Sequence, residues 1–263
     1  MTTILSGKTA LVTGSTSGIG LGIAQALAEQ GANIVFNGFG AAHEIAQLQA
    51  DVAARFKVQT AYHNADMSKP AEIAALMAFA VDKFGAVDVL VNNAGIQHVA
   101  NIEDFPLEKW DAIIAINLSS AFHTTRLALP AMKRRNWGRI INLASVHGLV
   151  GSAQKSAYVA AKHGMVGLTK VTALETAHTG ITCNAICPGW VLTPLVQKQV
   201  DARAAEAGIS NEQAKNKLVA EKQPSGEFVT PEQLGALAVF FCSEAGAQVR
   251  GVAWNVDGGW VAQ

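Results

Sequence analysis

Short runs of apolar residues, many of them β-branched, alternate along this chain with longer stretches of helical periodicity. The first run, residues 9–13, leads through several glycines into a stretch where Ile19, Ile23 and Leu27 share one helix face. Gly31 follows as a C-terminal stop. Because this alternation is typical of βαβ units, the sequence predicts a single-domain, doubly wound α/β fold with helices on both faces of a mostly parallel, seven-stranded sheet.

The later elements repeat this alternation. We expect strands at residues 33–36, 87–91, 139–144, 181–186 and 252–256, and helices at residues 107–134, 154–178 and 231–241. Ser68 and Pro70 suit the N-cap and first turn of one more helix. That helix should run to Phe84, where Gly85 ends it.

Composition narrows the class of protein. Half of the 263 residues are hydrophobic and 15% are charged, which excludes a disordered chain. Lys plus Arg and Asp plus Glu number 20 each, so no net charge draws the chain to nucleic acid or to an acidic membrane surface. Apolar stretches such as residues 74–81 are too short to cross a bilayer. Residues 1–8 do not resemble a secretory signal, so we expect a cytoplasmic protein.

The three cysteines, Cys183, Cys187 and Cys242, lie in apolar segments. Their number is odd, and a lone C-x-x-x-C spacing without further Cys or His is poor for binding a metal. We therefore expect buried, reduced thiols and no metal site.

Residues 193–226 depart from the general pattern, because they are polar, rich in Ala, Lys, Gln and Glu, and helical in propensity. They follow the C-terminal end of a predicted strand, where ligands of open α/β sheets bind. We interpret this segment of the single domain, residues 1–263, as a lid over the substrate. A solvated pair of surface helices fits the composition equally well.

A glycine-rich turn, Thr-Gly-Ser-Thr-Ser-Gly-Ile-Gly at residues 13–20, joins the first strand to the first helix. Its glycines allow the backbone to approach a pyrophosphate closely, and the amides of the helix N-terminus attract that group. The turn lacks the Lys and the following Ser or Thr of a P-loop. It therefore indicates a dinucleotide cofactor and not a nucleoside triphosphate.

The residues after the second strand bear on which dinucleotide is bound. An acid that binds the ribose of NAD is expected about 20 residues beyond the glycines, yet residues 36–39 read Phe-Asn-Gly-Phe. Neither residues 37–42 nor the glycine turn contain Arg or Lys to hold the 2′-phosphate of NADP. We therefore predict NAD, with Phe39 as an apolar wall for the adenosine. The alternative interpretation of Phe39 is a core or interface aromatic.

Several motifs follow one another in a fixed order: the glycine turn, Asn-Asn-Ala-Gly at 92–95, Asn117, Ser145, Tyr-Val-Ala-Ala-Lys at 158–162, and Pro188-Gly189. In these motifs the chain resembles the short-chain dehydrogenase/reductase family over nearly its whole length, including the 13 residues from Ser145 to Tyr158. The resemblance implies a Rossmann fold, a homotetramer and a catalytic set consisting of Asn117, Ser145, Tyr158 and Lys162.

Tyr158 and Lys162 suit proton exchange with an alcohol. Hydride transfer between nicotinamide and a carbinol carbon needs a second group that takes or gives the hydroxyl proton. A tyrosine does so when its pKa falls from about 10 toward neutrality. Lys162 follows Tyr158 by four residues on the same helix face, and its positive charge favours phenolate. By resemblance, Ser145 positions the substrate oxygen and Asn117 connects Lys162 to solvent.

The family resemblance also implies where residues lie along the cofactor. Asp66 and Met67 are expected at the adenine, Asn93 on the adenine-ribose side, and residues 188–193 at the nicotinamide carboxamide. The full set expected to contact NAD is Gly14, Thr16, Ser17, Gly18, Ile19, Gly20, Phe39, Asp66, Met67, Asn93, Ala94, Gly95, Tyr158, Lys162, Pro188, Gly189, Val191 and Thr193.

Polar residues beside the catalytic set favour an acidic substrate. His147 and Lys155 lie within three positions of the predicted serine and tyrosine, so two potential cations converge at the mouth of the site. Gln97 and Gln199 add amide donors, and together these groups suit a small carboxylate. The alternative interpretations are a solvated lysine for Lys155 and a turn residue for His147.

The segments around these residues resemble the branch of the family that acts on short D-3-hydroxy acids. The resemblance implies reversible oxidation of (R)-3-hydroxybutyrate to acetoacetate with NAD+, a reaction of ketone-body metabolism. The implied substrate-binding residues are Gln97, Ser145, His147, Lys155, Tyr158, Trp190, Gln199 and Trp260, with the two tryptophans as aromatic walls. The alternative enzymes are a 3-oxoacyl-thioester reductase or another alcohol dehydrogenase of the family. A cofactor-binding regulator without catalysis is the alternative outside enzymes.

Overall fold

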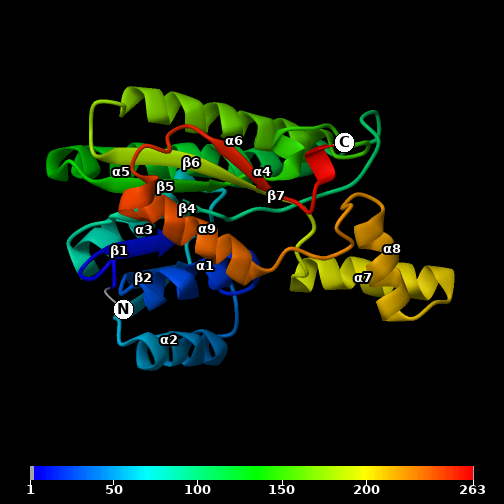
Figure 1. Cartoon of the computed structure of the whole chain (residues 1–263), viewed down its shortest axis with the longest axis horizontal. Helices are drawn as coiled ribbons and strands as arrows, with labels where there is room; N and C mark the ends of the chain where they lie inside the picture. The colour runs from blue at the N-terminus through cyan, green and yellow to red at the C-terminus, as the bar shows by residue number, and fades with distance from the viewer. Residues whose placement is uncertain (1–2, 263) are drawn as a thin grey trace.

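Parallel strands form one sheet at the centre of the computed structural model, which describes residues 3–262 (Figure 1). Within these residues the sheet has seven strands in the order β3-β2-β1-β4-β5-β6-β7, and each neighbouring pair is parallel. The strands are β1 (Thr9–Val12), β2 (Asn33–Asn37), β3 (Thr60–His63), β4 (Val89–Asn92), β5 (Gly138–Leu143), β6 (Ile181–Pro188) and β7 (Ala253–Val256). The predicted doubly wound α/β fold is confirmed.

Helices cover both faces of this sheet, which is why its central strands are buried along their whole length. The helices are α1 (Gly18–Glu29), α2 (Ala42–Phe56), α3 (Pro70–Phe84), α4 (Leu107–Ile114), α5 (Ser120–Arg135), α6 (Ser156–Glu175), α7 (Pro194–Ala207), α8 (Asn211–Ala220) and α9 (Pro231–Cys242). Helices α1, α2 and α9 pack into the core on one face, and α3, α5 and α6 into the core on the other (Figure 1).

Two elements near the N-terminal half lie outside the predicted set. Helix α2 buries only Ile45 and Val52 completely, but Ile45, Leu48 and Val52 recur at helical spacing, a signal that the sequence analysis did not use. Strand β3 pairs with β2 at the edge of the sheet, and its residues Thr-Ala-Tyr-His lack an apolar run. Helix α2 packs against β3 and α1, and β3 is held by pairing with β2, so the local pattern fails to indicate β3 alone.

The start of α3 corrects one prediction. Lys69 is the N-cap of this helix and Pro70 occupies its first turn, so Ser68 is not the cap. The Ser68 hydroxyl instead donates a hydrogen bond to Asp66 Oδ1 at 2.7 Å. The predicted end is confirmed, because Gly85 follows Phe84 in the left-handed region with φ +80°.

The long helix expected at residues 107–134 is continuous but irregular. A π-helical turn, η1 (Ala115–Ser119), separates α4 from α5. Asn117 lies in this turn and is fully buried. The extra residue of a π-turn redirects side chains, and such turns are frequent at functional sites.

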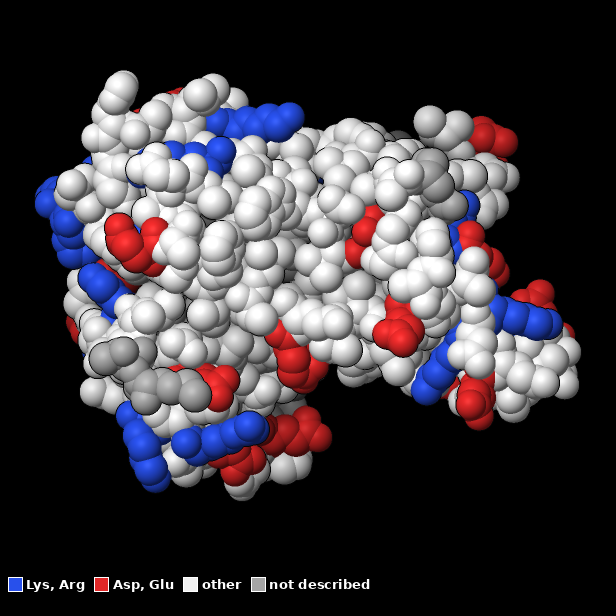
Figure 2. Space-filling model, in the orientation of Figure 1, with Lys and Arg blue, Asp and Glu red and all other residues white. Residues whose placement is uncertain are grey.

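Residues 193–226 form a helical pair, α7 and α8, which projects from the body of the protein (Figure 1). The pair has its own small core, formed by Val196, Val200, Ala204, Ala214 and Leu218. Its two ends meet at a bridge between Val191 and Val229. Figure 2 shows a notch between this projection and the body, and basic and acidic residues mixed over the visible face. Residues 3–262 contain no helix with the length and apolar character of a membrane span.

Helices α1 and α9 cross at a glycine contact. A Cβ added to Gly22 would lie 2.4 Å from Pro231 Cβ and 3.1 Å from the carbonyl carbon of Pro231. Because one of these atoms belongs to the backbone, a side-chain rotation cannot relieve the clash.

We predict that Gly22→Ala lowers the free energy of unfolding by about 1–3 kcal/mol, the usual cost of overpacking. Helix propensity alone predicts the opposite, a gain of about 1 kcal/mol. Equilibrium unfolding in urea distinguishes the two effects. A higher urea midpoint for the variant would show that the helices separate at no cost.

Candidate active site

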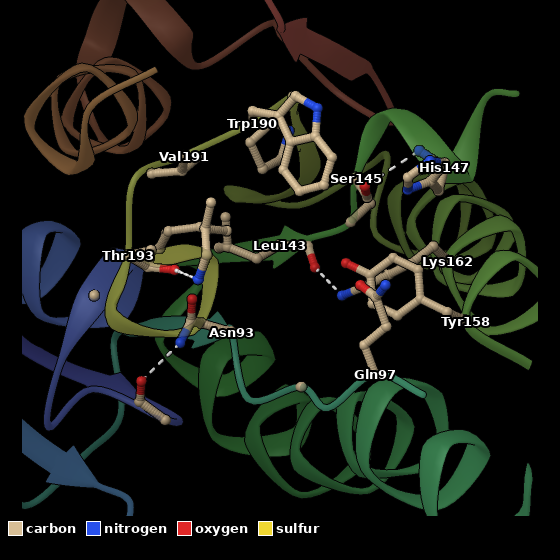
Figure 3. A pocket seen from close by; sticks show the side chains of 18 of the residues that line it. Asn93, Gln97, Leu143, Ser145, His147, Tyr158, Lys162, Trp190, Val191 and Thr193 are labelled. Carbon is tan, nitrogen blue, oxygen red and sulfur yellow. Dashed lines mark hydrogen bonds between the residues drawn. The ribbon is translucent and has the colours of Figure 1, made fainter. Parts of the chain in front are cut away.

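A cleft opens at the C-terminal ends of the central strands, where ligands of such sheets bind (Figure 3). The segments that follow β1, β4, β5 and β6 line it, together with α6, the start of α7 and Trp260. Of the predicted residues, this cleft brings together Gly14, Ser17, Gly18, Ile19, Gly20, Asn93, Ala94, Gly95, Gln97, Ser145, His147, Lys155, Tyr158, Lys162, Pro188, Gly189, Trp190, Val191, Thr193, Gln199 and Trp260.

The glycine turn is packed tightly against the segment after β4. Asn93 Nδ2 donates to the carbonyl oxygens of Thr13 and Gly14, each at 2.8 Å. A Cβ on Gly20 would lie 2.4 Å from the Gly14 carbonyl oxygen, so only glycine fits there. The sequence motif therefore reflects backbone contact within the protein as well as room for a ligand.

The N-terminus of α1 faces the cleft with its amides available. Ser17 is the N-cap, yet its side chain makes no capping hydrogen bond within the described chain, and the first turn contains no acid. Gly18, Ile19 and Gly20 of this turn line the cleft. Uncapped amides and the helix dipole make such a terminus a site for an anion, and a pyrophosphate fits it.

Asn37 stands at the end of β2, where an acid was expected. It is buried, and its Oδ1 accepts a hydrogen bond from the Gly14 amide at 3.2 Å. Its Nδ2 donates to the carbonyl oxygens of His63 and Ala65. Asn37 therefore holds the glycine turn to the end of β3, and its side chain is fully used within the protein.

Four residues predicted to contact the cofactor, Thr16 and the adenosine-side residues Phe39, Asp66 and Met67, lie outside the lining of the described cleft. Phe39 is 69% exposed, and its carbonyl oxygen accepts a hydrogen bond from Thr16 Oγ1 at 3.0 Å. Met67 is buried in the hydrophobic core between the sheet and helices α3, α5 and α6. Asp66 accepts hydrogen bonds from Ser68, and these hold the pKa of its carboxyl below the usual range. Contacts of these residues with adenosine stay predictions.

Ser145 and Tyr158 meet at the centre of the cleft (Figure 3). Ser145 follows β5, and its Oγ accepts a hydrogen bond from the His147 amide at 3.2 Å. Burial raises the pKa of Tyr158, and a hydrogen bond with the Ser145 side chain offsets part of this rise. The expected fall of the Tyr158 pKa is therefore wrong for this structure, and the neutral phenol is its resting form.

Lys162 lies one turn beyond Tyr158 on α6 and is almost completely buried. Its Nζ donates to the Leu143 carbonyl oxygen at 2.6 Å and lies 5.6 Å from the centre of the Tyr158 ring. Burial lowers the pKa of Lys162 to about 8, which leaves it mostly protonated at neutral pH. The two side chains share one buried space, as predicted, but the ammonium group contacts the strand and not the phenol oxygen.

Asn117 does not line the cleft, but it lies next to the segment after β4 that does. Its Oδ1 accepts a hydrogen bond from the Ile96 amide and its Nδ2 donates to the Ile96 carbonyl oxygen, each at 2.9 Å. The amide therefore fixes the segment that carries Gln97 into the cleft. The predicted connection of Lys162 to solvent stays a prediction.

Aromatic rings close the far end of the cleft. The His147 ring lies edge-to-face with Tyr158 at 6.0 Å and with Trp260 at 5.4 Å between centres. Trp190 is 6.0 Å from Trp260. Asp257 supports this end, because its carboxylate accepts hydrogen bonds from the Gly259 and Val261 amides on either side of Trp260.

The two expected cations differ in charge. Lys155 Nζ lies 5.4 Å from the centre of the Trp190 ring, and burial lowers its pKa. Burial, reinforced by Lys155, lowers the pKa of His147 to about 4, so His147 is neutral at neutral pH. The prediction of two converging cations is therefore wrong in this respect. Among the described residues that line the cleft, none is acidic.

Sequence reasoning missed part of the lining. Ile96, Leu143, Ala144, Val146, Pro194 and Val196 also face the cleft. Leu143 acts through its carbonyl oxygen, for which no side-chain signal exists. Cys183, Cys187 and Cys242 are buried and free within the described chain. Residues 3–262 contain no cluster of three or more His, Cys, Asp or Glu arranged for a metal ion.

A family model described as short chain dehydrogenase matches residues 8–204, and the chain therefore belongs to the short-chain dehydrogenase family. This assignment agrees with the observed fold and with the arrangement of Ser145, Tyr158 and Lys162 around the cleft.

Two curated relatives share a name. A D-beta-hydroxybutyrate dehydrogenase of Cupriavidus necator is 72% identical over 261 residues, covering 99% of this chain and 100% of that protein. A protein of the same name from Rhizobium meliloti is 57% identical, covering 97% of this chain and 99% of its own length. Among solved structures, L-sorbose reductase from Gluconobacter frateurii, complexed with NADPH and L-sorbose, has a TM-score of 0.95 and 30% identity, with 100% of both chains covered.

The neutral state of His147 predicts a pH dependence of folding. Its folded-state pKa of about 4 lies below the ordinary value of 6.5 for His, so the unfolded chain binds the proton first. The contribution of neutral His147 to the free energy of unfolding is therefore fully present above pH 6.5 and is lost as the pH falls toward 4. We expect this residue to account for about 3 kcal/mol of the loss over that interval. Urea unfolding at successive pH values should show a shallower acid loss for His147→Gln, whereas equal slopes would contradict the assignment.

Proposed function

We propose that this chain interconverts (R)-3-hydroxybutyrate and acetoacetate with NAD+ and NADH. The observation that carries the proposal is the 72% identity, over essentially the whole chain, with a protein named D-beta-hydroxybutyrate dehydrogenase. The site supports it from the chemical side. A buried tyrosine for proton exchange lies beside an aromatic-walled end with a lysine and no lining carboxylate among the described residues.

The residues of the cleft fit a nicotinamide dinucleotide. We place its pyrophosphate at the α1 N-terminus and its nicotinamide beside Pro188, Gly189, Val191 and Thr193. Gly18 supports this placement, because a Cβ there would contact Thr193 at 3.4 Å, which brings the glycine turn to the nicotinamide end. When bound, the nicotinamide supplies or accepts the hydride. NAD is preferred over NADP because residues 37–42 and the glycine turn contain no Lys or Arg for a 2′-phosphate.

Tyr158 exchanges the proton of the substrate oxygen. In the direction of reduction, its neutral phenol donates the Oη proton to the carbonyl oxygen as the hydride arrives at carbon. In the direction of oxidation, the phenol first releases its proton toward solvent, and the phenolate then takes the hydroxyl proton of the substrate; the positive charge of Lys162 in the same space offsets part of the cost of the phenolate. Ser145, which lines the cleft beside Tyr158, holds the substrate oxygen in reach of that proton.

Lys155, His147, Gln97 and Gln199 receive the carboxylate of the substrate. Lys155 supplies the positive charge, while neutral His147 and the two amides supply N–H donors. Neutral alcohols leave these donors without an acidic partner; for His147, the buried one, the penalty is roughly 1–3 kcal/mol, and lid closure extends it to the half-buried Gln97, Lys155 and Gln199. The site therefore selects acids, because a substrate without a carboxylate leaves these donors unpaired. Trp190 and Trp260 limit the length of the acid.

The helical pair of residues 193–226 acts as a lid over this acid. It begins directly after Val191 and carries Gln199 into the cleft. Closure of such a segment excludes water, which strengthens the contact between Lys155 and a carboxylate.

We infer a homotetramer from the family, and large apolar side chains that stay exposed on two parts of the fold support it. Leu107, Phe122 and Leu174 expose large side chains on α4, α5 and α6, with Leu174 at 76%. Trp254 is exposed on β7, the edge strand of the sheet. Two distinct self-complementary surfaces are what a closed tetramer of dimers requires. Size-exclusion chromatography with light scattering measures the assembly.

A steady-state panel tests the proposed reaction. We expect turnover of (R)-3-hydroxybutyrate with NAD+ to exceed that of the (S) enantiomer and of neutral secondary alcohols by at least about 100-fold in kcat/KM, the effect of losing more than one buried contact. NADPH should support acetoacetate reduction far less well than NADH. Preferred turnover of a 3-oxoacyl thioester with NADPH would overturn the proposal in favour of an acyl-thioester reductase.

Lys155 offers a direct test of the carboxylate end. Lys155→Ala should raise the KM for acetoacetate about 10- to 100-fold, because a charge-assisted hydrogen bond is lost. The dissociation constant of NADH should stay unchanged, since Lys155 lies at the substrate end. Lys198→Ala, an exposed lysine of α7, is the matched control and should leave both constants unchanged. An unchanged KM in Lys155→Ala would remove this residue from the site.

A further inference from the structure

Gln223 lies at the end of the lid with its side chain completely buried. Its Oε1 accepts a hydrogen bond from the Trp190 amide, and its Nε2 donates to the Glu227 carbonyl oxygen at 2.5 Å. Trp190 precedes the lid in the chain and Glu227 follows it. One buried amide therefore joins the entry and the exit of the lid.

Glycine makes this contact possible. A Cβ on Gly189 would lie 2.2 Å from Gln223 Oε1, so any side chain there would displace the amide. The Val229 amide adds a parallel bond by donating to the Trp190 carbonyl oxygen at 2.9 Å. The main-chain amide of Trp190 is thus held by Gln223 and its carbonyl oxygen by Val229. Both partners belong to the C-terminal end of the lid or to the residues just after it.

The ring of Trp190 depends on this main-chain hold. Its Nε1 is buried without a hydrogen-bond partner among residues 3–262, so no polar contact of its own orients the indole. The ring packs against the core of the helical pair on one side and lines the cleft near Lys155 and Trp260 on the other. Movement of the Trp190 backbone therefore moves the wall of the substrate end.

We infer that Gln223 is a positioning residue that fixes the Trp190 wall and thereby sets the length of 3-hydroxy acid that the site accepts. This inference rests on the proposed function. Gln223 touches neither the reacting atoms nor the carboxylate-binding side chains; it acts through the main chain of Trp190.

Only a primary amide satisfies both ends of this contact. The Trp190 amide needs an acceptor and the Glu227 carbonyl oxygen needs a donor. Methionine, of similar length, leaves both main-chain groups unpaired. Glutamate keeps the acceptor but sets a second oxygen against the Glu227 carbonyl oxygen, unless that carboxyl is protonated.

The first experiment compares Gln223→Met with Gln213→Met. Gln213 belongs to the capping box of α8 in the same helical pair, where its side chain bonds to Ser210, so its variant controls for general loosening of the lid. We expect Gln223→Met to raise the KM for (R)-3-hydroxybutyrate about tenfold, the scale of one lost buried hydrogen bond, with kcat and the NADH dissociation constant nearly unchanged. The ratio of kcat/KM for the four-carbon acid to that for (R)-3-hydroxyhexanoate should fall about tenfold, and Gln213→Met should leave this ratio as in the wild type. An unchanged ratio in Gln223→Met, or an equal fall in both variants, overturns the inference.

The second experiment uses pH as a readout that general destabilisation does not produce. In Gln223→Glu, protonation of the introduced carboxyl restores a donor toward the Glu227 carbonyl oxygen. The KM of this variant should therefore approach that of the wild type as the pH falls from about 8 to about 6, because burial raises the pKa of such a carboxyl. A constant ratio between the variant and wild-type KM values across this range counts against the proposed geometry.

Hydrogen exchange separates this inference from the proposed reaction. In the unliganded protein, amides of residues 189–196 should exchange faster in Gln223→Met than in Gln213→Met or the wild type. Unchanged exchange overturns the hold on Trp190, whatever the substrate. If the wild type fails to oxidise (R)-3-hydroxybutyrate, the proposed function and the chain-length role fail, while the exchange result still decides whether Gln223 holds Trp190.

Discussion

A buried ammonium group sets the geometry of the active site. Lys162 donates to the carbonyl oxygen of Leu143, the last residue of β5, at 2.6 Å. A charge removed from water needs such a partner, and the carbonyl oxygen offsets part of the cost that appears as the pKa of about 8. Because the bond joins α6 to the sheet, it fixes how far along β5 this helix lies. Tyr158, one turn earlier on α6, is thereby brought opposite Ser145.

The fold could be predicted where the local pattern and the tertiary role agree. The strands buried on both faces read as apolar runs, and glycines or prolines mark the ends of α1, α3 and α9. Strand β3 lies at the edge of the sheet and lacks an apolar run, so its sequence carries little signal, whereas the apolar residues of α2 do recur at helical spacing and the helix could have been predicted. The cap of α3 shows a different limit, because Ser68 prefers the nearby Asp66 carboxylate to the helix amides. Such competition between partners is decided by three-dimensional arrangement.

Residue types in the site could be predicted better than their charge states. Ser145, Tyr158, Lys155 and His147 all line one cleft, as the family resemblance and the positions of Lys155 and His147 near Tyr158 and Ser145 indicated. The phenol of Tyr158 and the imidazole of His147 are neutral because surrounding elements exclude water from them. That exclusion comes from residues distant in the chain, including Trp260 near the C-terminus. The position of Gln223 could not be predicted for the same reason, since it lies in a polar segment and its hydrogen-bond partners come close only in the folded chain.

The helical pair between β6 and α9 is joined to the body at neighbouring points, where Val191 bridges Val229. Its core is made from its own residues together with Trp190, Ile209 and Phe228. An excursion built in this way is a module: it can be lengthened, shortened or replaced while the strands and the side chains of Ser145, Tyr158 and Lys162 keep their places. The 30% identical sugar reductase superimposes with a TM-score of 0.95, which shows how little the scaffold changes when sequences diverge. Changes in this excursion can therefore alter one wall of the substrate end without disturbing the strands, while Gln97, His147, Lys155 and Trp260 belong to the body.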